Sequence, residues 1–329
     1  MSQAVHVRGA TRMRVVILDD GYDHYDAERR ILAPLGAEVA LLPCCGNAEA
    51  VRAALIGADA ALVRESPIDA AALDAAPALR GIVRYGVGVD NIALAEAAAR
   101  RIPVCNVPDY GVEEVSDHAL ALLLAVARRL PEADARVRAG GWGVPRTRPV
   151  YRLAGGTLGL IGFGRIATAL LRKARGLGFA RILIAAPGLR TVPEGCTLVD
   201  AMTLATEADA ISLHAPATAA THHLVSAEFL ARMKPNAVLV NTSRGALIDE
   251  AALAAALAEG RIMGAGLDVF ESEPLPLDSP LRHLPNVILT DHAAWYSEAA
   301  IVDLQRKAAE EVARLLRGDA PLHQVNRWN

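Results

Sequence analysis

Cysteine and aromatic residues are scarce in this chain of 329 residues, and neither sign of charge is in large excess. Only four cysteines occur, none in a CxxC or Cys/His arrangement with metal-binding spacing. We therefore expect reduced thiols and no metal site, with a strained vicinal disulfide between Cys44 and Cys45 as the alternative. Aromatics make up 4% against a hydrophobic content of 53%, which indicates helix-rich packing around small side chains.

Long apolar runs are also absent. The longest, Ala119–Ala127, falls far short of the roughly 20 residues that a bilayer requires. The N-terminus lacks the apolar core and cleavage site of a secretory signal. A net charge of −3 gives no electrostatic reason for a nucleic-acid or membrane-surface partner. The sequence predicts a soluble cytoplasmic protein, in which residues 1–12 are either a disordered leader or a misplaced start.

The chain does contain a repeated α/β rhythm, in which short β-branched runs alternate with alanine-rich helical stretches. This alternation favours βα units and parallel sheets, and the length suggests two domains. We expect an α/β fold of two doubly wound parallel-sheet domains. The first is flavodoxin-like and spans 1–108, completed by a helical return at 296–329. Its strand candidates are Arg14–Leu18, Glu38–Leu42, Ala60–Val63, Gly81–Tyr85 and Val104–Asn106.

The second domain, residues 109–295, has the six strands of a Rossmann dinucleotide-binding domain. Its strand candidates are Thr157–Ile161, Ile182–Ala185, Ala210–Leu213, Ala237–Asn241, Gly264–Leu267 and Val287–Leu289. A long helix at Glu113–Leu130 precedes them and is too apolar for a lone surface helix. We expect this helix to be buried between domains or between subunits, and hence a homodimer through the dinucleotide-binding domains.

A glycine turn follows the strand at 157–161. Gly162 permits the tight turn, and Gly164 removes a side chain that would keep a pyrophosphate from the backbone. Arg165 and Ile166 then begin a helix, and Ala167 is small enough for that helix to pack on the strand. Phosphates would meet free N–H groups at the positive end of the helix dipole. The pattern alone is weak, but its position between a strand and an amphipathic helix makes it a dinucleotide site.

The acidic residue that usually holds the cofactor ribose is missing from the end of the next strand. Ala186 stands in its place, with Arg190 four residues later. A carboxylate there would repel the 2′-phosphate of NADP, so that repulsion is gone. We expect NAD, with NADP left open.

Three later segments are polar at strand ends, where open α/β sheets bind ligands. They are 241–249 (NTSRGALID), 264–274 (GAGLDVFESEP) and 289–298 (LTDHAAWYSE). Together with 85–91 (YGVGVDN), 106–110 (NVPDY) and 115–118 (VSDH), they closely resemble the D-isomer-specific 2-hydroxyacid dehydrogenases. HAAWYSE at 292–298 resembles the C-terminal-binding-protein branch in particular. The resemblance covers nearly the whole chain from residue 13.

The resemblance implies an NAD(P)-dependent oxidoreductase acting on a 2-keto acid or a D-2-hydroxy acid, and the chemistry agrees. Arg244 would hold the substrate carboxylate and polarise the carbonyl, because a guanidinium is always charged and forks onto oxygen pairs. His292 would be the general acid or base. Glu273 would hydrogen-bond His292, favouring its charged form and fixing its tautomer.

Further roles follow from the same resemblance. The first domain would bind substrate, through the backbone N–H groups of Val87 and Gly88 and through Arg64. Trp295 would be either an apolar wall of the substrate site or a packing residue. Asp268 would face the nicotinamide amide. The remaining cofactor contacts would be His214, Pro216, Thr221, Thr242, Ser243 and Ala294.

One departure from the family lies beside the catalytic histidine, where Asp291 replaces the usual proline. This carboxylate would raise the pKa of His292 if it pointed inward, or would face solvent. His118 and the pair His222 and His223 are interpreted as structural or peripheral. The alternative function is a dinucleotide-sensing protein-interaction module like the animal C-terminal-binding proteins.

Overall fold

The computed structural model describes residues 12–328 and has two compact α/β units. One unit joins the chain up to Tyr110 with the segment from Ser297 onward, and the other is Gly111–Tyr296. Both contain a parallel sheet with helices on its two faces, so the predicted fold class is confirmed. The expectation for residues 1–12 falls, except at Arg12, outside the described residues.

The first unit is built on a five-stranded parallel sheet in the order β2-β1-β3-β4-β5, the flavodoxin-like order. Its strands are β1 (Arg14–Ile17), β2 (Glu38–Leu41), β3 (Ala60–Val63), β4 (Ile82–Arg84) and β5 (Val104–Cys105). Its helices are α1 (Asp26–Leu32), α2 (Ala48–Leu55), α3 (Ala70–Asp74), α4 (Leu94–Ala99) and α11 (Glu298–Arg317), with a 3-10 turn at Ala33–Leu35.

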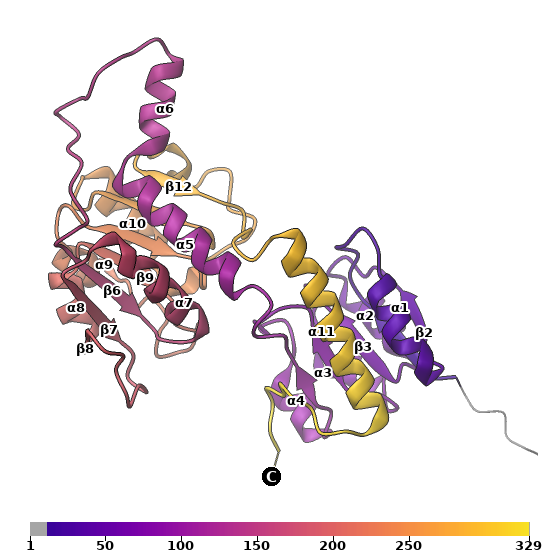
Figure 1. Ribbon diagram of the computed structural model, residues 1–329. Coiled ribbons are helices and arrows are strands. Elements are labelled where there is room, and N and C mark those ends of the chain that lie inside the picture. Colours follow the sequence, from indigo (N-terminus) through magenta and orange to yellow (C-terminus); the bar gives the residue numbers. More distant parts are fainter. Residues whose placement is uncertain (1–11, 329) are drawn as a thin grey trace, which may run out of the picture. The chain divides into compact units, whose positions relative to one another are not determined.

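The side chains of β1 alternate between two cores, as the pleat of a strand requires. Val15 and Ile17 pack with α1 and α11, whereas Val16 and Leu18 pack with α2, α3 and α4. All four side chains are fully buried. Helix α11 lies against this sheet (Figure 1), and the hydroxyl of Ser297 caps its first turn.

The second unit has a seven-stranded parallel sheet in the order β12-β11-β10-β9-β6-β7-β8. Its strands are β6 (Thr157–Ile161), β7 (Arg181–Ala185), β8 (Cys196–Leu198), β9 (Ala210–Leu213), β10 (Val238–Asn241), β11 (Gly264–Leu267) and β12 (Val287–Leu289). The prediction of six strands was wrong by one. Strand β8 has three residues, lies at the sheet edge and is mostly exposed, so it lacks the apolar run that marked the others.

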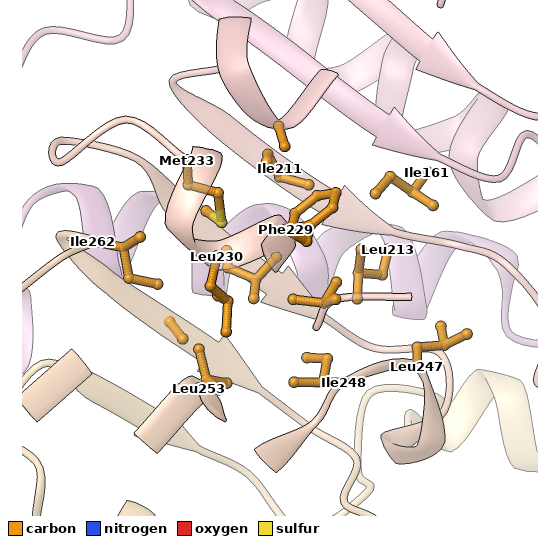
Figure 2. Close-up of a cluster of buried hydrophobic side chains, with 14 of the residues drawn as sticks. Ile161, Ile211, Leu213, Phe229, Leu230, Met233, Leu247, Ile248, Leu253 and Ile262 are labelled. Carbon is orange, nitrogen blue, oxygen red and sulfur yellow. The ribbon is translucent and has the colours of Figure 1, made fainter. Parts of the chain in front are cut away.

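Helices cover both faces of this sheet. They are α5 (Val112–Ala127), α7 (Arg165–Ala174), α8 (Ala201–Glu207), α9 (Ala227–Arg232) and α10 (Glu250–Ala258), with 3-10 turns at Arg175–Leu177, Gly245–Leu247 and Pro280–His283. Helix α6 (Leu130–Arg138) contacts α5 and has no buried residue. Helices α5 and α7 share one core with the sheet. Helices α8, α9 and α10 close the other core around Phe229, as Figure 2 shows.

The long helix expected at Glu113–Leu130 is α5, which ends earlier, at Ala127. Arg129 adopts a left-handed conformation with φ of 49°, which ends α5 and starts α6. The apolar face of α5, including Leu122 and Leu123, is buried on β10 and β11 of its own unit. The burial of this face is therefore explained within one unit, and burial of the helix between subunits stays a prediction. Among the described residues, no helix is long and apolar enough to span a bilayer.

Candidate active site

The glycine turn after β6 is a backbone structure that only glycine fits. Gly162 has φ of +82°, and a Cβ there would lie 2.6 Å from backbone atoms of His214 and Ala215. Its N–H donates to the carbonyl of Ala185, which ties the turn to β7. The chain can therefore pass close to the start of the β9 loop only because residue 162 lacks a side chain.

Helix α7 begins at this turn with an uncapped N-terminus. Gly164 is its N-cap residue, no side chain accepts from its first N–H groups, and no acidic residue lies in its first turn. Ala167 is fully buried against the sheet, and a Cβ on Gly164 would meet open space. Donors that lack partners at the positive end of a helix, beside open space, fit the pyrophosphate of a dinucleotide.

No carboxylate follows β7. Ala186 is half-buried at its end, and Arg190 is exposed and forms no ion pair with any residue between 12 and 328. Arg165, on the first turn of α7, is likewise exposed and unpaired within that range. The local charge is thus positive, which accommodates the ribose of NAD and also the 2′-phosphate of NADP.

The loops after β9 and β10 border the same turn. His214 bonds to the hydroxyl of Ser212 at 2.9 Å, and burial lowers the pKa of His214 to about 4. The hydroxyl of Thr221 donates to the carbonyl of Pro216 at 2.7 Å and closes the exposed turn between them. An imidazole with this pKa is neutral at physiological pH, so His214 offers a hydrogen bond and no charge.

After β10, the buried side chain of Asn241 fixes the next turn by accepting from the N–H of Ser243 and donating to the carbonyl of Arg244. The hydroxyl of Ser243 donates to Leu213. Thr242 carries a buried hydroxyl that has no partner among the described residues. A buried polar atom without a partner is costly, so this hydroxyl after β10 fits a ligand that bonds to it.

Arg244 is half-buried at the end of this turn. Its Nη1 donates to the carbonyl of Ser243 at 2.8 Å, and its positive charge lowers the pKa of Glu273. Gly245 follows, and a Cβ on it would lie 1.8 Å from the carbonyl carbon of Phe270. The backbone after Arg244 therefore packs directly on the loop that carries Glu273.

That loop brings Glu273 to His292. The Nδ1 of His292 lies 2.7 Å from Oε2 of Glu273, while Oε1 accepts from the N–H of Phe270 at 2.9 Å. Burial alone would raise the pKa of Glu273. The hydrogen bonds from His292 and Phe270 and the positive charges of His292 and Arg244 outweigh it, so the pKa is lowered. Glu273 is consequently an anion that holds the imidazole by one nitrogen, which leaves Nε2 for another partner.

A buried carboxylate holds the His292 loop. Asp268, at the end of β11, is 1% exposed and accepts from the Thr290 hydroxyl and from the N–H groups of Ala293 and Ala294, at 2.6 to 3.0 Å. Its carbonyl accepts from the N–H of His292. His292 has φ of 55°, which is unfavourable for a side-chain-bearing residue by about 1–3 kcal/mol. These bonds stabilise that conformation.

The side chain of His118, interpreted from sequence as structural or peripheral, joins this loop. Its Nε2 lies 3.0 Å from the Thr290 hydroxyl and 3.5 Å from Oδ1 of Asp268. Its contact could not be read from sequence, because Thr290 is 172 positions away. The only indication in the sequence is that His118 lies on a predicted apolar helix, which is α5 and packs against the sheet.

Two neighbours of His292 had alternative interpretations from the sequence, Asp291 for its orientation and Trp295 for its role. Asp291 is exposed and pairs with no residue between 12 and 328, which favours its solvent-facing alternative. Trp295 is half-buried and stacks edge-to-face on Tyr296, with ring centroids 5.8 Å apart. The backbone of Trp295 lies against Gly111.

In the first unit, the loop after β4 offers backbone donors. The N–H groups of Val87 and Gly88 form no hydrogen bond within the described chain, and the side chain of Asn106 fixes the loop by donating to the carbonyl of Val87 at 2.7 Å. After β3, Arg64 pairs with Glu65 at 3.0 Å and lies over the Tyr22 ring. Both loops can bind an anion.

Comparisons with known proteins agree with this geometry. Residues 120–294 match the family model for the NAD binding domain of D-isomer specific 2-hydroxyacid dehydrogenases. The glyoxylate reductase of Korarchaeum cryptofilum is 46% identical over 79% of this chain and 80% of its own length.

Two solved structures are similar over nearly the whole chain. An acyclic imino acid reductase in complex with NADPH and D-Arg superimposes with a TM-score of 0.87 at 30% identity, over 95% of this chain and all of the other. A D-lactate dehydrogenase of Aquifex aeolicus with NAD and lactic acid gives 0.82 at 27%, over 93% and 96%. The chain is thus an enzyme that uses NAD or NADP, and it belongs to the D-isomer specific 2-hydroxyacid dehydrogenase family.

Proposed function

We propose that this enzyme reduces a small 2-keto acid, glyoxylate or a close analogue, to the corresponding 2-hydroxy acid, which is the D isomer wherever the product is chiral. The observation that carries the proposal is the pair of His292 and Glu273 with the charge of Arg244 beside it. The reaction consumes one keto acid, one reduced nicotinamide and one proton, and yields the hydroxy acid and the oxidised cofactor. Bound NADH or NADPH supplies the hydride.

His292 supplies the proton. Its Nδ1 is held by Glu273, so Nε2 is the nitrogen that donates to the carbonyl oxygen during reduction and accepts from the hydroxyl during oxidation. The lowered pKa of Glu273 keeps that carboxylate ionised, and its hydrogen bond to Nδ1 fixes the orientation of the imidazole. Arg244 binds the substrate carboxylate with its guanidinium and polarises the carbonyl.

The cofactor contacts support the same assignment. Gly162, Gly164, Arg165 and Ile166 form the pyrophosphate site at the N-terminus of α7, and the hydroxyl of Thr242 receives a bond from the cofactor. We assign the remaining cofactor contacts to His214, Pro216, Thr221, Ser243, Asp268 and Ala294. NAD stays the first expectation, and the unpaired Arg190 supports use of NADP as well.

In the first unit, we assign Arg64, Val87 and Gly88 to binding of the substrate carboxylate, so residues 1–108 with 296–329 form the substrate domain and 109–295 the dinucleotide-binding domain. The N–H groups of Val87 and Gly88 support this because they lack partners in the described chain. Trp295 is proposed to set how much apolar bulk the substrate carries. Its half-buried indole offers a flat apolar surface.

A panel of 2-keto acids, each assayed with NADH and with NADPH by nicotinamide absorbance, tests the proposal. Glyoxylate is expected among the best substrates by kcat/KM, and chiral analysis of the product from pyruvate is expected to give the D isomer. Absence of turnover with every keto acid and both cofactors would contradict the proposal. Turnover with imines of keto acids alone would indicate an imino acid reductase instead.

The branch resembling C-terminal-binding proteins stays a prediction, carried by residues 292–298. A dinucleotide-sensing module would bind NADH tightly and turn over nothing, so the same panel with a binding titration separates the two functions. The intact pair of His292 and Glu273 favours catalysis. The cytoplasmic location also stays a prediction, and the four free thiols agree with it.

We also propose that the enzyme is a homodimer, for a reason other than the one expected. Helix α6 and the segment after it extend from the second unit (Figure 1). They expose large apolar side chains, with Trp142 90% and Val144 84% accessible, alongside Leu130, Val137 and Tyr151. Such a surface is unfavourable in water. Light scattering at micromolar concentration is expected to report a dimer and, for Trp142→Ser, a larger monomer fraction.

A further inference from the structure

A second histidine–glutamate cluster lies on the surface of the seven-stranded unit, outside the residues assigned above. Within residues 12–328, His222, His223 and Glu271 form the one group of at least three His, Cys, Asp or Glu side chains whose ligand atoms all lie within 4.8 Å of one another. The three side chains are exposed or half-buried, so an ion in solution can reach them.

The arrangement of the two imidazoles suits a shared partner. The rings of His222 and His223 stack with centroids 3.9 Å apart and planes at 25°. The Nε2 of His223 lies 2.5 Å from Oε1 of Glu271. Tetrahedral zinc with bonds of about 2.0–2.2 Å places its ligand atoms roughly 3.4 Å apart. Small rotations of exposed side chains therefore bring the three atoms onto one ion.

The backbone around the cluster is already fixed. The N–H of His223 donates to the carbonyl of Ala246, and His223 has φ of 50°. On the other side, the N–H of Glu271 donates to the carboxylate of Glu250 at 2.6 Å, and the N–H of Glu250 lies 3.4 Å from Oε2 of Glu271. Only Oε1 of Glu271 faces His223. The ligands are thus held by two loops whose positions do not depend on an ion.

Charge at the cluster also favours a cation. Glu271 and Glu273 lie on the loop after β11, and the carboxylate of Glu250, at the start of α10, accepts from the N–H of Glu271. Glu273 has His292 as its partner, whereas Glu271 has only the neutral or protonated His223. A divalent ion would compensate the carboxylates of Glu250 and Glu271. Two imidazoles and a carboxylate are the ligand set that borderline transition metals prefer over calcium or magnesium.

We propose that His222, His223 and Glu271 form a binding site for a zinc-class divalent ion, with solvent completing the coordination. Binding replaces the hydrogen bond between His223 and Glu271 by two metal–ligand bonds and releases to solvent any proton held on the liganding nitrogens. The ion fastens the 218–225 turn to the loop that continues to Glu273. The site does not depend on the proposed substrate, because none of the three ligands is among the residues assigned to catalysis.

Isothermal titration of the full-length enzyme with zinc chloride tests this site. The wild type is expected to bind one ion per chain. His222→Asn, His223→Asn and Glu271→Gln are each expected to weaken binding by more than 10-fold, since even partners of ligands cost roughly 10- to 100-fold. His283→Asn is the matched control, because it removes an exposed imidazole of the same unit that does not belong to the cluster.

A second control tests whether zinc binds instead at the pair of His292 and Glu273. His292→Asn is expected to keep the zinc affinity of the wild type. Equal affinity in the wild type and the three ligand variants would overturn the site, as would loss of binding in His292→Asn or no saturable binding up to about 1 mM zinc. Circular dichroism establishes that each variant is folded. Zinc is also expected to raise the Tm of the wild type but not of Glu271→Gln, because the ion binds the folded state.

Discussion

The seven-stranded unit has two histidine–glutamate pairs whose glutamates, Glu271 and Glu273, lie on the same loop after β11. The two pairs differ in the residues that surround them. His292 and Glu273 have a cation beside them, and Glu273 is fixed by the N–H of Phe270. His223 and Glu271 have a second imidazole and a second carboxylate instead. The fixed anion Glu273 and the cation Arg244 suit His292 to exchange a proton with a bound acid, as proposed. The two imidazoles beside Glu271 suit that cluster to bind a metal ion, as proposed. The same two residue types therefore gain different chemistry from their neighbours.

The largest expected effect is on turnover. His292→Asn is expected to lower kcat by roughly 10²- to 10⁴-fold, because it removes the proposed proton donor. Cofactor affinity, measured by NADH fluorescence, is expected to stay within about 2-fold, since His292 is not assigned to the dinucleotide. His223→Asn, assayed in chelator-treated buffer, is expected to lose far less activity. A loss as large as that of His292→Asn would contradict the distinction between the pairs.

The next largest effect is expected when the carboxylate of Glu273 is replaced by an amide. Glu273→Gln is expected to lower kcat by about 10- to 100-fold with little change in KM, because the imidazole keeps a hydrogen-bond partner but loses its charge partner. The pKa of Glu273 is lowered in the folded enzyme, so its stabilising contribution is present above its unfolded pKa and is lost as pH falls through the folded value. The Tm difference between wild type and Glu273→Gln is therefore expected to shrink below about pH 4.5. An unchanged difference would contradict the bonding described for Glu273.

Gly245 tests whether the two pairs are mechanically linked. Gly245→Ala places a Cβ 1.8 Å from the carbonyl carbon of Phe270, so the loop of Glu271 and Glu273 must shift. We expect destabilisation of about 1–3 kcal/mol by urea unfolding and about a 10-fold loss of kcat/KM. Zinc affinity is expected to fall with it. Gly176→Ala is the matched control, since a Cβ there has no neighbour within 4 Å. If Gly245→Ala lowered kcat/KM but not zinc affinity, or zinc affinity but not kcat/KM, the two pairs would be independent.

His214 provides a reference histidine without a carboxylate partner. Its pKa is lowered from 6.5 to about 4 by burial, so the unfolded chain takes up a proton first as pH falls. The contribution of neutral His214 is complete above about pH 6.5 and is lost progressively toward pH 4. Between pH 7 and 5, the wild type is expected to lose about 2 kcal/mol more stability than His214→Gln. Equal losses by urea unfolding would contradict the burial of this ring.

Much of the fold could be predicted because buried parallel strands leave a strong signal. Strands such as β6 and β9 are short apolar runs between helices, and their predicted limits agree with the structure. Strand β8 escaped because it is exposed at a sheet edge. The helix was predicted to run on to Leu130 because the left-handed residue that follows α5 is Arg129 and not a glycine, and Pro131 at the start of α6 lies beyond that limit.

The candidate site residues also divide into those that local motifs mark and those that only the fold brings together. Residues grouped at strand ends, such as Arg244 and Glu273, could be found in sequence because local motifs mark them. The cluster at His222 and His223 could not, because Glu271 is 48 positions from His223 and only the fold brings them together. The bonds of Asp268 to the His292 loop were missed for a related reason. Its donors lie 22 to 26 positions away, and nothing local links them to it.

The anchoring of the His292 loop by Asp268 has a consequence for heat inactivation. Asp268 is buried at the end of β11, a strand that is paired on both sides, so the loop keeps its shape for as long as that strand stays in the sheet. A loop held only by surface contacts would lose its geometry at temperatures below the unfolding of its domain. Here, activity and the seven-stranded sheet should disappear together on heating, and the temperature limit of catalysis is set by the core.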